Sequence, residues 1–143
     1  MPEIHRFALV THSPDQMFDL VRDVARYPEF LPWVQAAEVH EQGESHQIAT
    51  LDVRVAGLAR RFTTRNTLVE NRSLAMQLAD GPFDELSGQW QFSPVGGEGT
   101  RISLDLSFSM PGSLLMLPFQ RGFGRVADRM VDDFCRRAEA IHG

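Results

Sequence analysis

The chain has 143 residues, a single cysteine and a formal net charge of −5. This length is typical of one domain, residues 1–143, which buries enough apolar surface to fold without disulfides or a metal. The acidic balance argues against binding through the phosphate backbone of nucleic acids, and we expect no DNA partner. The sequence shows no signal peptide and no membrane span, so we expect a cytoplasmic protein with at most a peripheral contact at the inner membrane.

The first third of the chain predicts one strand and two short helices. Residues 1–11 are typical of an edge strand. Ser13-Pro14-Asp15-Gln16 then indicates a helix start, with Ser13 as N-cap, Pro14 at the first helical position and Gln16 completing a capping box. This helix should end before Pro28. Pro28 and Pro32 bracket a second short helix or tight turn, with Trp33 directly behind it.

Residues 34–108 predict six further strands, because apolar and polar residues alternate between turn-forming segments. The alternation is cleanest at Ile102, Leu104, Leu106 and Phe108, and Gly88 inside a strand indicates a bend or bulge. One face of this sheet should be covered and the other wet. The predicted strands are 34–41, 46–55, 58–69, 73–79, 83–93 and 101–108.

The C-terminal segment predicts one long helix from Leu114 to Ile141, after a break at Pro111-Gly112. Its apolar residues follow steps of three, four and seven, which places them on one side of the helix. Such a helix laid across a curved sheet can enclose an apolar cavity, or its ridge can simply be core. The ridge consists of Phe119, Phe123, Val126, Met130, Phe134 and Ile141.

This order predicts an α+β protein, and it resembles the helix-grip fold of the START-like, polyketide cyclase and lipid-transport superfamily. Within it, the chain is similar to the subfamily of coenzyme-Q-binding proteins and RatA-type ribosome-association toxins. The resemblance rests on Asp23 to Trp33, on Phe62 to Asn66, and on Asp80 to Phe83 followed by Leu86, Gly88 and Trp90. It implies a curved seven-stranded antiparallel sheet wrapped around the C-terminal helix, with a ligand tunnel between them.

The apolar residues that would face this tunnel are the candidate ligand-binding residues. On the strand from 58 to 69, Phe62, Thr64 and Asn66 share one face, and the two polar groups would need either a quinone carbonyl or a buried water as partner. The loop before Trp33 would either cap the tunnel mouth or act as a plain apolar plug. The predicted wall residues are Phe62, Met76, Phe83, Trp90, Phe92, Phe119, Phe123 and Met130, with Leu31 and Trp33 at the mouth.

An open tunnel is energetically expensive, and this limits its state. A dry void of about 500 Å³ would cost roughly 12 kcal/mol. That rivals the stability of a whole domain, so the space must hold ligand or solvent or must partly collapse. Pro118, Gly122 and Gly124 weaken local helix, and we expect a looser chain over residues 114–123 when no ligand is bound.

Arg121, Arg125 and Arg129, spaced four apart, share one helix face, here called the arginine row. The row is either a solvated face or a site for an anionic partner such as lipid headgroups or RNA. The sequence shows no metal-ligand spacing and no phosphate loop. We therefore expect no metal and no cofactor, with a quinone bound only as ligand.

Three functions follow. The first is non-enzymatic binding of a polyprenyl quinone such as ubiquinone. The second, implied by the resemblance, is a toxin that binds the large (50S) ribosomal subunit and blocks subunit association. The third is a polyketide cyclase or aromatase, which would need a positioned acid or base. The five histidines argue against it, because each is expected at the surface without a carboxylate partner. They are His5, His12, His40, His46 and His142.

Overall fold

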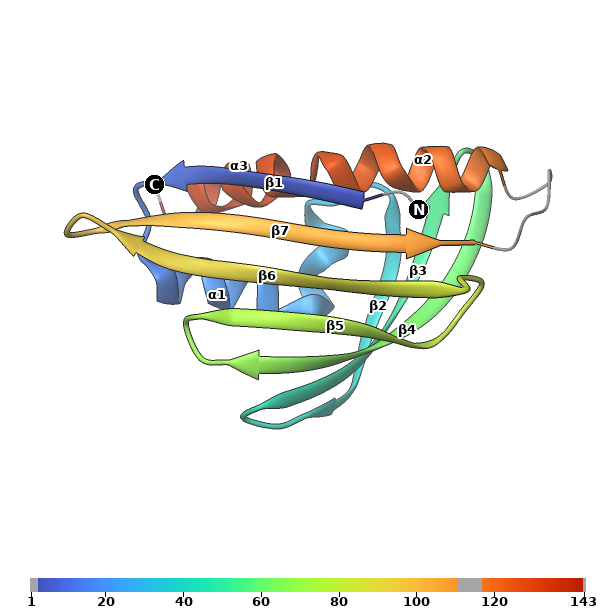
Figure 1. Ribbon diagram of the computed structural model, residues 1–143, viewed down its shortest axis with the longest axis horizontal. Helices are drawn as coiled ribbons and strands as arrows, with labels where there is room; N and C mark the ends of the chain where they lie inside the picture. Colours follow the sequence, from blue (N-terminus) through green and yellow to red (C-terminus); the bar gives the residue numbers. More distant parts are fainter. Residues whose placement is uncertain (1–2, 111–116, 143) are drawn as a thin grey trace.

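The computed structural model describes residues 3–110 and 117–142, and its centre is one antiparallel sheet of seven strands. The strand order is β1-β7-β6-β5-β4-β3-β2 (Figure 1), which confirms the predicted fold class. The strands are β1 Glu3–Val10, β2 Val34–Gln42, β3 His46–Val55, β4 Leu58–Val69, β5 Ser73–Asp80, β6 Glu85–Val95 and β7 Gly99–Ser109.

Two short helices connect β1 to β2, as predicted. The first, α1 Pro14–Arg22, begins where the capping box places it, and the backbone N–H of Ser13 donates to Oε1 of Gln16 at 3.2 Å. The second, the 3₁₀ helix η1 Val24–Glu29, begins and ends earlier than the predicted segment between the two prolines and contains Pro28. A 3₁₀ turn tolerates this proline because short helices leave most of their N–H groups without an internal partner.

The sheet curves at bulges whose positions differ from the predicted one. Register shifts lie in β2, between Val34 and Ala36 and between Val39 and Glu41, and in β4 at Thr63. The register at Gly88 is regular, so of the predicted bend or bulge there the bulge is excluded. A Cβ on Gly88 would lie 2.7 Å from Cδ1 of Leu106 and 3.0 Å from the Asp105 carbonyl oxygen, so this glycine serves close packing instead.

The C-terminal segment forms two helices, not the single helix that was predicted. They are α2 Leu117–Asp128 and α3 Met130–His142, interrupted by a turn at Arg129. The predicted break at 111–112 and the apolar start at 114–116 lie outside the described residues. Pro118 stands in the first turn of α2, where a proline costs little, so it does not weaken the helix interior.

The buried side of α2 and α3 agrees only in part with the predicted ridge. Phe119, Phe123 and Phe134 are buried as expected. Ile141 is 47 % exposed, however, which contradicts its predicted place in the ridge. The buried face passes instead through Ala127, Val131 and Ala138.

All three α-helices cover one face of the sheet, and the core lies between them and that face. Phe18 of α1 meets Phe92 of β6 with ring centroids 5.8 Å apart, and Phe134 of α3 meets Trp90 of the same strand at 5.0 Å. Figure 1 shows α2 and α3 following one another along β1 and β7. None of the helices in the described part of the chain has the length and apolarity to cross a membrane.

Candidate functional site

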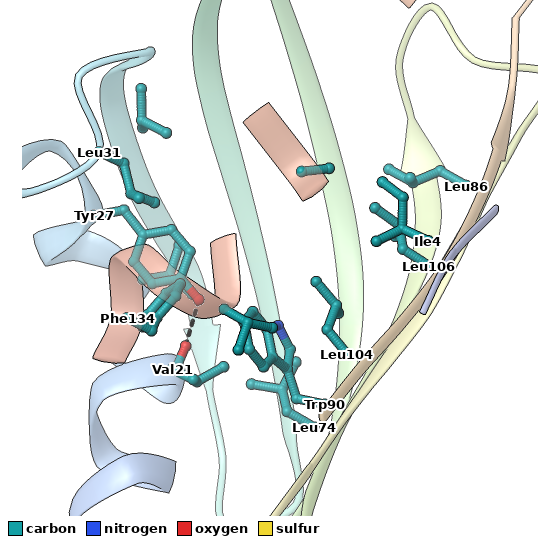
Figure 2. Packing of buried hydrophobic residues seen from close by; sticks show 14 of the residues in the cluster. Ile4, Val21, Tyr27, Leu31, Leu74, Leu86, Trp90, Leu104, Leu106 and Phe134 are labelled. Carbon is teal, nitrogen blue, oxygen red and sulfur yellow. Dashed lines mark hydrogen bonds between the residues drawn. The ribbon is translucent and has the colours of Figure 1, made fainter. Parts of the chain in front are cut away.

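A small, partly open hollow lies between the sheet and the C-terminal helices, where the resemblance implies a ligand site. Its volume is about 60 Å³. Figure 2 shows part of the surrounding core, with Tyr27 and Phe134 opposite Trp90, Leu74 and Leu104. The hollow is lined by Val24, Tyr27, Trp33, Ala49, Leu51, Phe62, Thr64, Asn66, Leu74, Met76, Leu86, Trp90, Leu104, Leu106, Phe123 and Met130.

Most of the predicted binding residues come together around this hollow. Strand β4 supplies three of them on one face, and β5, β6, the C-terminal helices and the loop residue directly before β2 supply the others. The predicted residues that line the hollow are Trp33, Phe62, Thr64, Asn66, Met76, Trp90, Phe123 and Met130.

Four predicted residues do not line the hollow. Leu31 is fully buried, so it does not stand at a mouth. Phe92 packs beneath α1 against Phe18. Phe83 and Phe119 belong to an aromatic cluster beyond Phe123, with Phe83 5.1 Å and Phe119 6.0 Å from that ring. Face alternation identifies these side chains as buried, but it does not say which buried side chains border a gap.

Eight of the lining residues were missed as site residues. Several of them, such as Leu51, Leu74 and Leu104, stand on the apolar faces of alternating strands. The alternation could have found them, because every strand crossing the middle of a covered sheet contributes to its centre. Val24 and Tyr27 come from η1, whose short length leaves no comparable periodic signal. The missed residues are Val24, Tyr27, Ala49, Leu51, Leu74, Leu86, Leu104 and Leu106.

A chain of two buried amides connects Asn66, which lines the hollow, to the backbone of α1. Nδ2 of Asn66 donates to Oε1 of Gln47 at 2.8 Å, and Nε2 of Gln47 donates to the carbonyl oxygen of Arg22 at 2.8 Å. Gln47 is fully buried and Asn66 is 2 % exposed. Oδ1 of Asn66 is buried without a partner among the described residues, and so is Nε1 of Trp33. Both residues line the hollow, so these two unpaired atoms, with the Thr64 hydroxyl, are its candidate polar contacts for a guest.

The described lining contains a single ionisable side chain, Tyr27. Its hydroxyl donates to the carbonyl oxygen of Val21 at 2.5 Å (Figure 2), and burial raises the pKa of Tyr27 well above its ordinary value. A phenol held in this way does not exchange protons near neutral pH. The described lining therefore offers contacts and hydrogen bonds to a guest but no acid or base.

The hollow is much smaller than a tunnel for a long isoprenoid chain. Small-molecule pockets typically measure about 300–1,000 Å³. A dry void of 60 Å³ costs only about 1.4 kcal/mol, so this state avoids most of the penalty of an open tunnel. In this structure the side chains fill most of the space that an open tunnel would leave empty. An isoprenoid guest would have to displace side chains such as Met76 and Met130, whose flexible thioethers repack readily.

The arginine row lies on the outside of the C-terminal helices. Arg121, Arg125 and Arg129 are exposed, and their side chains form no hydrogen bond or ion pair with any described residue. Arg121 and Arg125 border a surface groove of about 330 Å³ together with Leu117, Pro118, Gly122 and Ala56. Six other arginines are paired with carboxylates: Arg6, Arg22, Arg26, Arg61, Arg136 and Arg137.

Three histidines depart from the expectation that each is an unpaired surface residue. One is the exposed His40, whose Nδ1 lies 3.9 Å from Oε1 of Glu38. His12 is 7 % exposed, and its Nε2 lies 3.1 Å from Oε2 of Glu139 on α3. His5 is exposed, but its Nδ1 lies 2.7 Å from Oδ1 of Asp105, and this hydrogen bond raises the pKa of His5. None of these histidines lines the hollow. Among the described residues no group of three or more His, Cys, Asp or Glu side chains is placed to hold a metal ion.

Comparison with protein-family models shows which family the chain is related to. Residues 10–135 match the family model described as polyketide cyclase / dehydrase and lipid transport. The chain belongs to this family. The match to the polyketide cyclase and lipid-transport family includes every residue that lines the hollow.

Individual relatives place the chain more narrowly within the family. It is 46 % identical over 140 residues to the ribosome association toxin RatA of Pseudomonas aeruginosa, covering 98 % of this chain and 97 % of that protein. It is 33 % identical over 87 residues to the mitochondrial coenzyme Q-binding protein COQ10 of Drosophila melanogaster, covering 60 % of this chain and 36 % of that protein.

A solved structure agrees with the fold. The Zhui aromatase/cyclase from a Streptomyces species superposes with a TM-score of 0.84 at 21 % identity, over 96 % of this chain and 93 % of that one. At this identity the likeness concerns the fold alone.

Proposed function

We propose that this protein binds the large ribosomal subunit and blocks its association with the small subunit. The observation that carries the proposal is the 46 % identity to a protein named ribosome association toxin, which extends over 98 % of the chain. The likeness to the coenzyme Q-binding protein covers only 60 %. Ribosome association is therefore the first candidate, and it places the protein in the cytoplasm.

The arginine row supplies a surface that fits ribosomal RNA. Its guanidinium groups form no hydrogen bond or close ion pair with a described carboxylate, so they can bind phosphates without breaking such a contact. The groove beside Arg121 and Arg125 also exposes Leu117, whose side chain is 37 % exposed. A local basic surface of this kind can bind RNA although the whole chain is acidic.

Sucrose-gradient profiles test this proposal. Purified protein added to dissociated subunits should lower the yield of 70S particles on return to associating magnesium. The double variant Arg121→Glu and Arg125→Glu should lose this effect, and Arg65→Glu with Arg72→Glu is the control because it changes the same charge on exposed strand and turn residues. Unchanged 70S formation with the wild-type protein would refute the proposal. Equal loss of the effect in both double variants would show that the arginine row is not the ribosome contact.

The hollow supports a second candidate function, the binding of an apolar small molecule such as a polyprenyl quinone. The observation that favours it is a largely apolar hollow lined by Asn66, whose Oδ1 has no partner among the described residues, since buried polar atoms in folded proteins nearly always have one. The lining supports binding over cyclase chemistry, because Tyr27 is its single ionisable group.

Both tryptophans of the chain, Trp33 and Trp90, line the hollow, so their fluorescence reports directly on a guest. Organic extraction of the purified protein with mass spectrometry, and titration with a short-chain ubiquinone, test this function. We expect a saturable change in tryptophan emission. An empty extract together with no saturable change would exclude the quinone.

A further inference from the structure

The direction of the Asn66 amide decides what kind of group the hollow can bind. In an amide the oxygen accepts hydrogen bonds and the nitrogen donates them. The orientation of the Asn66 amide is determined by Gln47, which itself lies next to the backbone carbonyl of Arg22. A carbonyl oxygen can only accept a hydrogen bond. The nitrogen of Gln47 must therefore face Arg22, and its oxygen must face Asn66.

It follows that Asn66 donates to Gln47 through Nδ2 and keeps Oδ1 unpaired. A second contact agrees, since Nε2 of Gln47 also lies 2.7 Å from Oε1 of Gln42. Flipping Asn66 would place two oxygens against one another. Oδ1 of Asn66, a residue that lines the hollow, is thus a buried acceptor of fixed orientation, held through Gln47 by a backbone carbonyl 25 residues from Gln47 in sequence.

We propose that the hollow selects a ligand that carries a hydroxyl group on an apolar body, such as a phenol or a quinol, over the corresponding carbonyl compound. A quinone oxygen can accept from Nε1 of Trp33 but has no hydrogen for Oδ1 of Asn66. A hydroxyl can pair with either kind of atom, and the adjacent Thr64 hydroxyl can donate to it or accept from it. This inference rests on the second proposed function, that the hollow takes a guest.

The selection should be strong, because a buried acceptor left unpaired in the complex keeps its full desolvation cost. We expect a hydroxyl compound to bind at least about tenfold more tightly than an isomer without a donor. The small volume of the hollow favours small probes, which require little movement of Met76 and Met130. 4-Ethylphenol and 4-methylanisole are suitable because they are isomers of equal size, and the ether is the more apolar one.

Nitrogen-15 NMR titrations of the full chain test this proposal, with the two tryptophan indoles and the Asn66 side-chain amide as reporters. 4-Ethylphenol should shift all three and bind about tenfold or more tightly than 4-methylanisole. In Asn66→Leu the preference should fall below about threefold while the phenol still binds. Leu68→Val, buried on the same strand but outside the lining, should keep the preference and serves as control.

The possible failures differ from one another. Equal affinities in the wild-type protein, or tighter binding of the ether, would overturn the selection for a donor and leave ligand binding standing. A lack of shift with either probe would overturn both this inference and the second proposed function. If Asn66→Leu does not fold, the side-chain amide signal of Asn66 in the wild-type protein tests the proposal instead. It should shift with the phenol but not with the ether, and equal shifts would overturn the proposal.

Discussion

Gly122 in α2 is the position where one added methyl group should disturb the seat of the C-terminal helices. A Cβ there would lie 2.4 Å from Cγ1 of Val55 and 3.4 Å from Cβ of Ala56 at the end of β3. Ordinary carbon contacts lie at about 3.5–4.0 Å, so Gly122→Ala forces α2 and β3 apart. We expect overpacking to cost about 1–3 kcal/mol, against a helix-propensity gain of about 1 kcal/mol.

Gly124→Ala is the matched control, two residues along the same helix. Its added Cβ would meet only Cζ of Phe108, at 3.7 Å, which is an ordinary contact. Both changes gain the same propensity, so the difference between the variants isolates the clash with Val55. Gly124→Ala should be more stable than Gly122→Ala by about 1–3 kcal/mol, or roughly 4–12 °C in Tm. Thermal and urea unfolding measure this, and equal stability would show that α2 does not sit on β3 as described.

Three further predictions concern ionisable groups. Burial raises the pKa of Tyr27 above its value in the unfolded chain, so the stability that the neutral phenol contributes is complete below about pH 10. Above that pH the unfolding free energy should fall by about 1.4 kcal/mol per pH unit until the pKa of the folded state is reached. Urea unfolding as a function of pH, with tyrosinate absorbance, measures this. The Arg6 guanidinium lowers the pKa of Asp128, so Arg6→Ala should be less stable than wild type at pH 7 but equal to it at pH 2 in urea unfolding. Burial raises the pKa of the Cys135 thiol to about 11, so a disulfide reagent at pH 8 should label the native thiol roughly 100-fold more slowly than the unfolded chain.

The sequence identified the elements of this fold wherever local chemistry alone determines them. The alternation from Ile102 to Phe108 gives β7, and the capping box at Ser13 gives the start of α1. The turn at Arg129 was not predictable, because no proline or glycine stands there and the interruption is one residue long. Gly88 was misread because a glycine needed for close packing has the same sequence signature as one at a bulge.

The site was predictable in its composition but not in its size or its polarity. Phe62 and Trp90 were expected near the interior from periodicity, and both line the hollow. Its volume depends on how all the side chains settle together, which no local pattern records. Gln47 escaped notice because a glutamine in a strand is normally read as facing water. Its complete burial depends on the carbonyl of Arg22, a partner that only the tertiary fold brings close.

The strand order has a consequence for synthesis of the chain. Strand β1 pairs only with β7, with Val10 opposite Thr100 and Glu3 opposite Ser107. About 90 residues must therefore be translated before the first strand can find its neighbour, which takes roughly 5–20 s at typical bacterial and eukaryotic rates. Through this interval Phe7 and Leu9 stand on an unpaired segment, and both stay more than half exposed after folding. Strand β1 is thus translated first but paired last, and this unpaired strand makes the N-terminal end of the nascent chain the most exposed to aggregation.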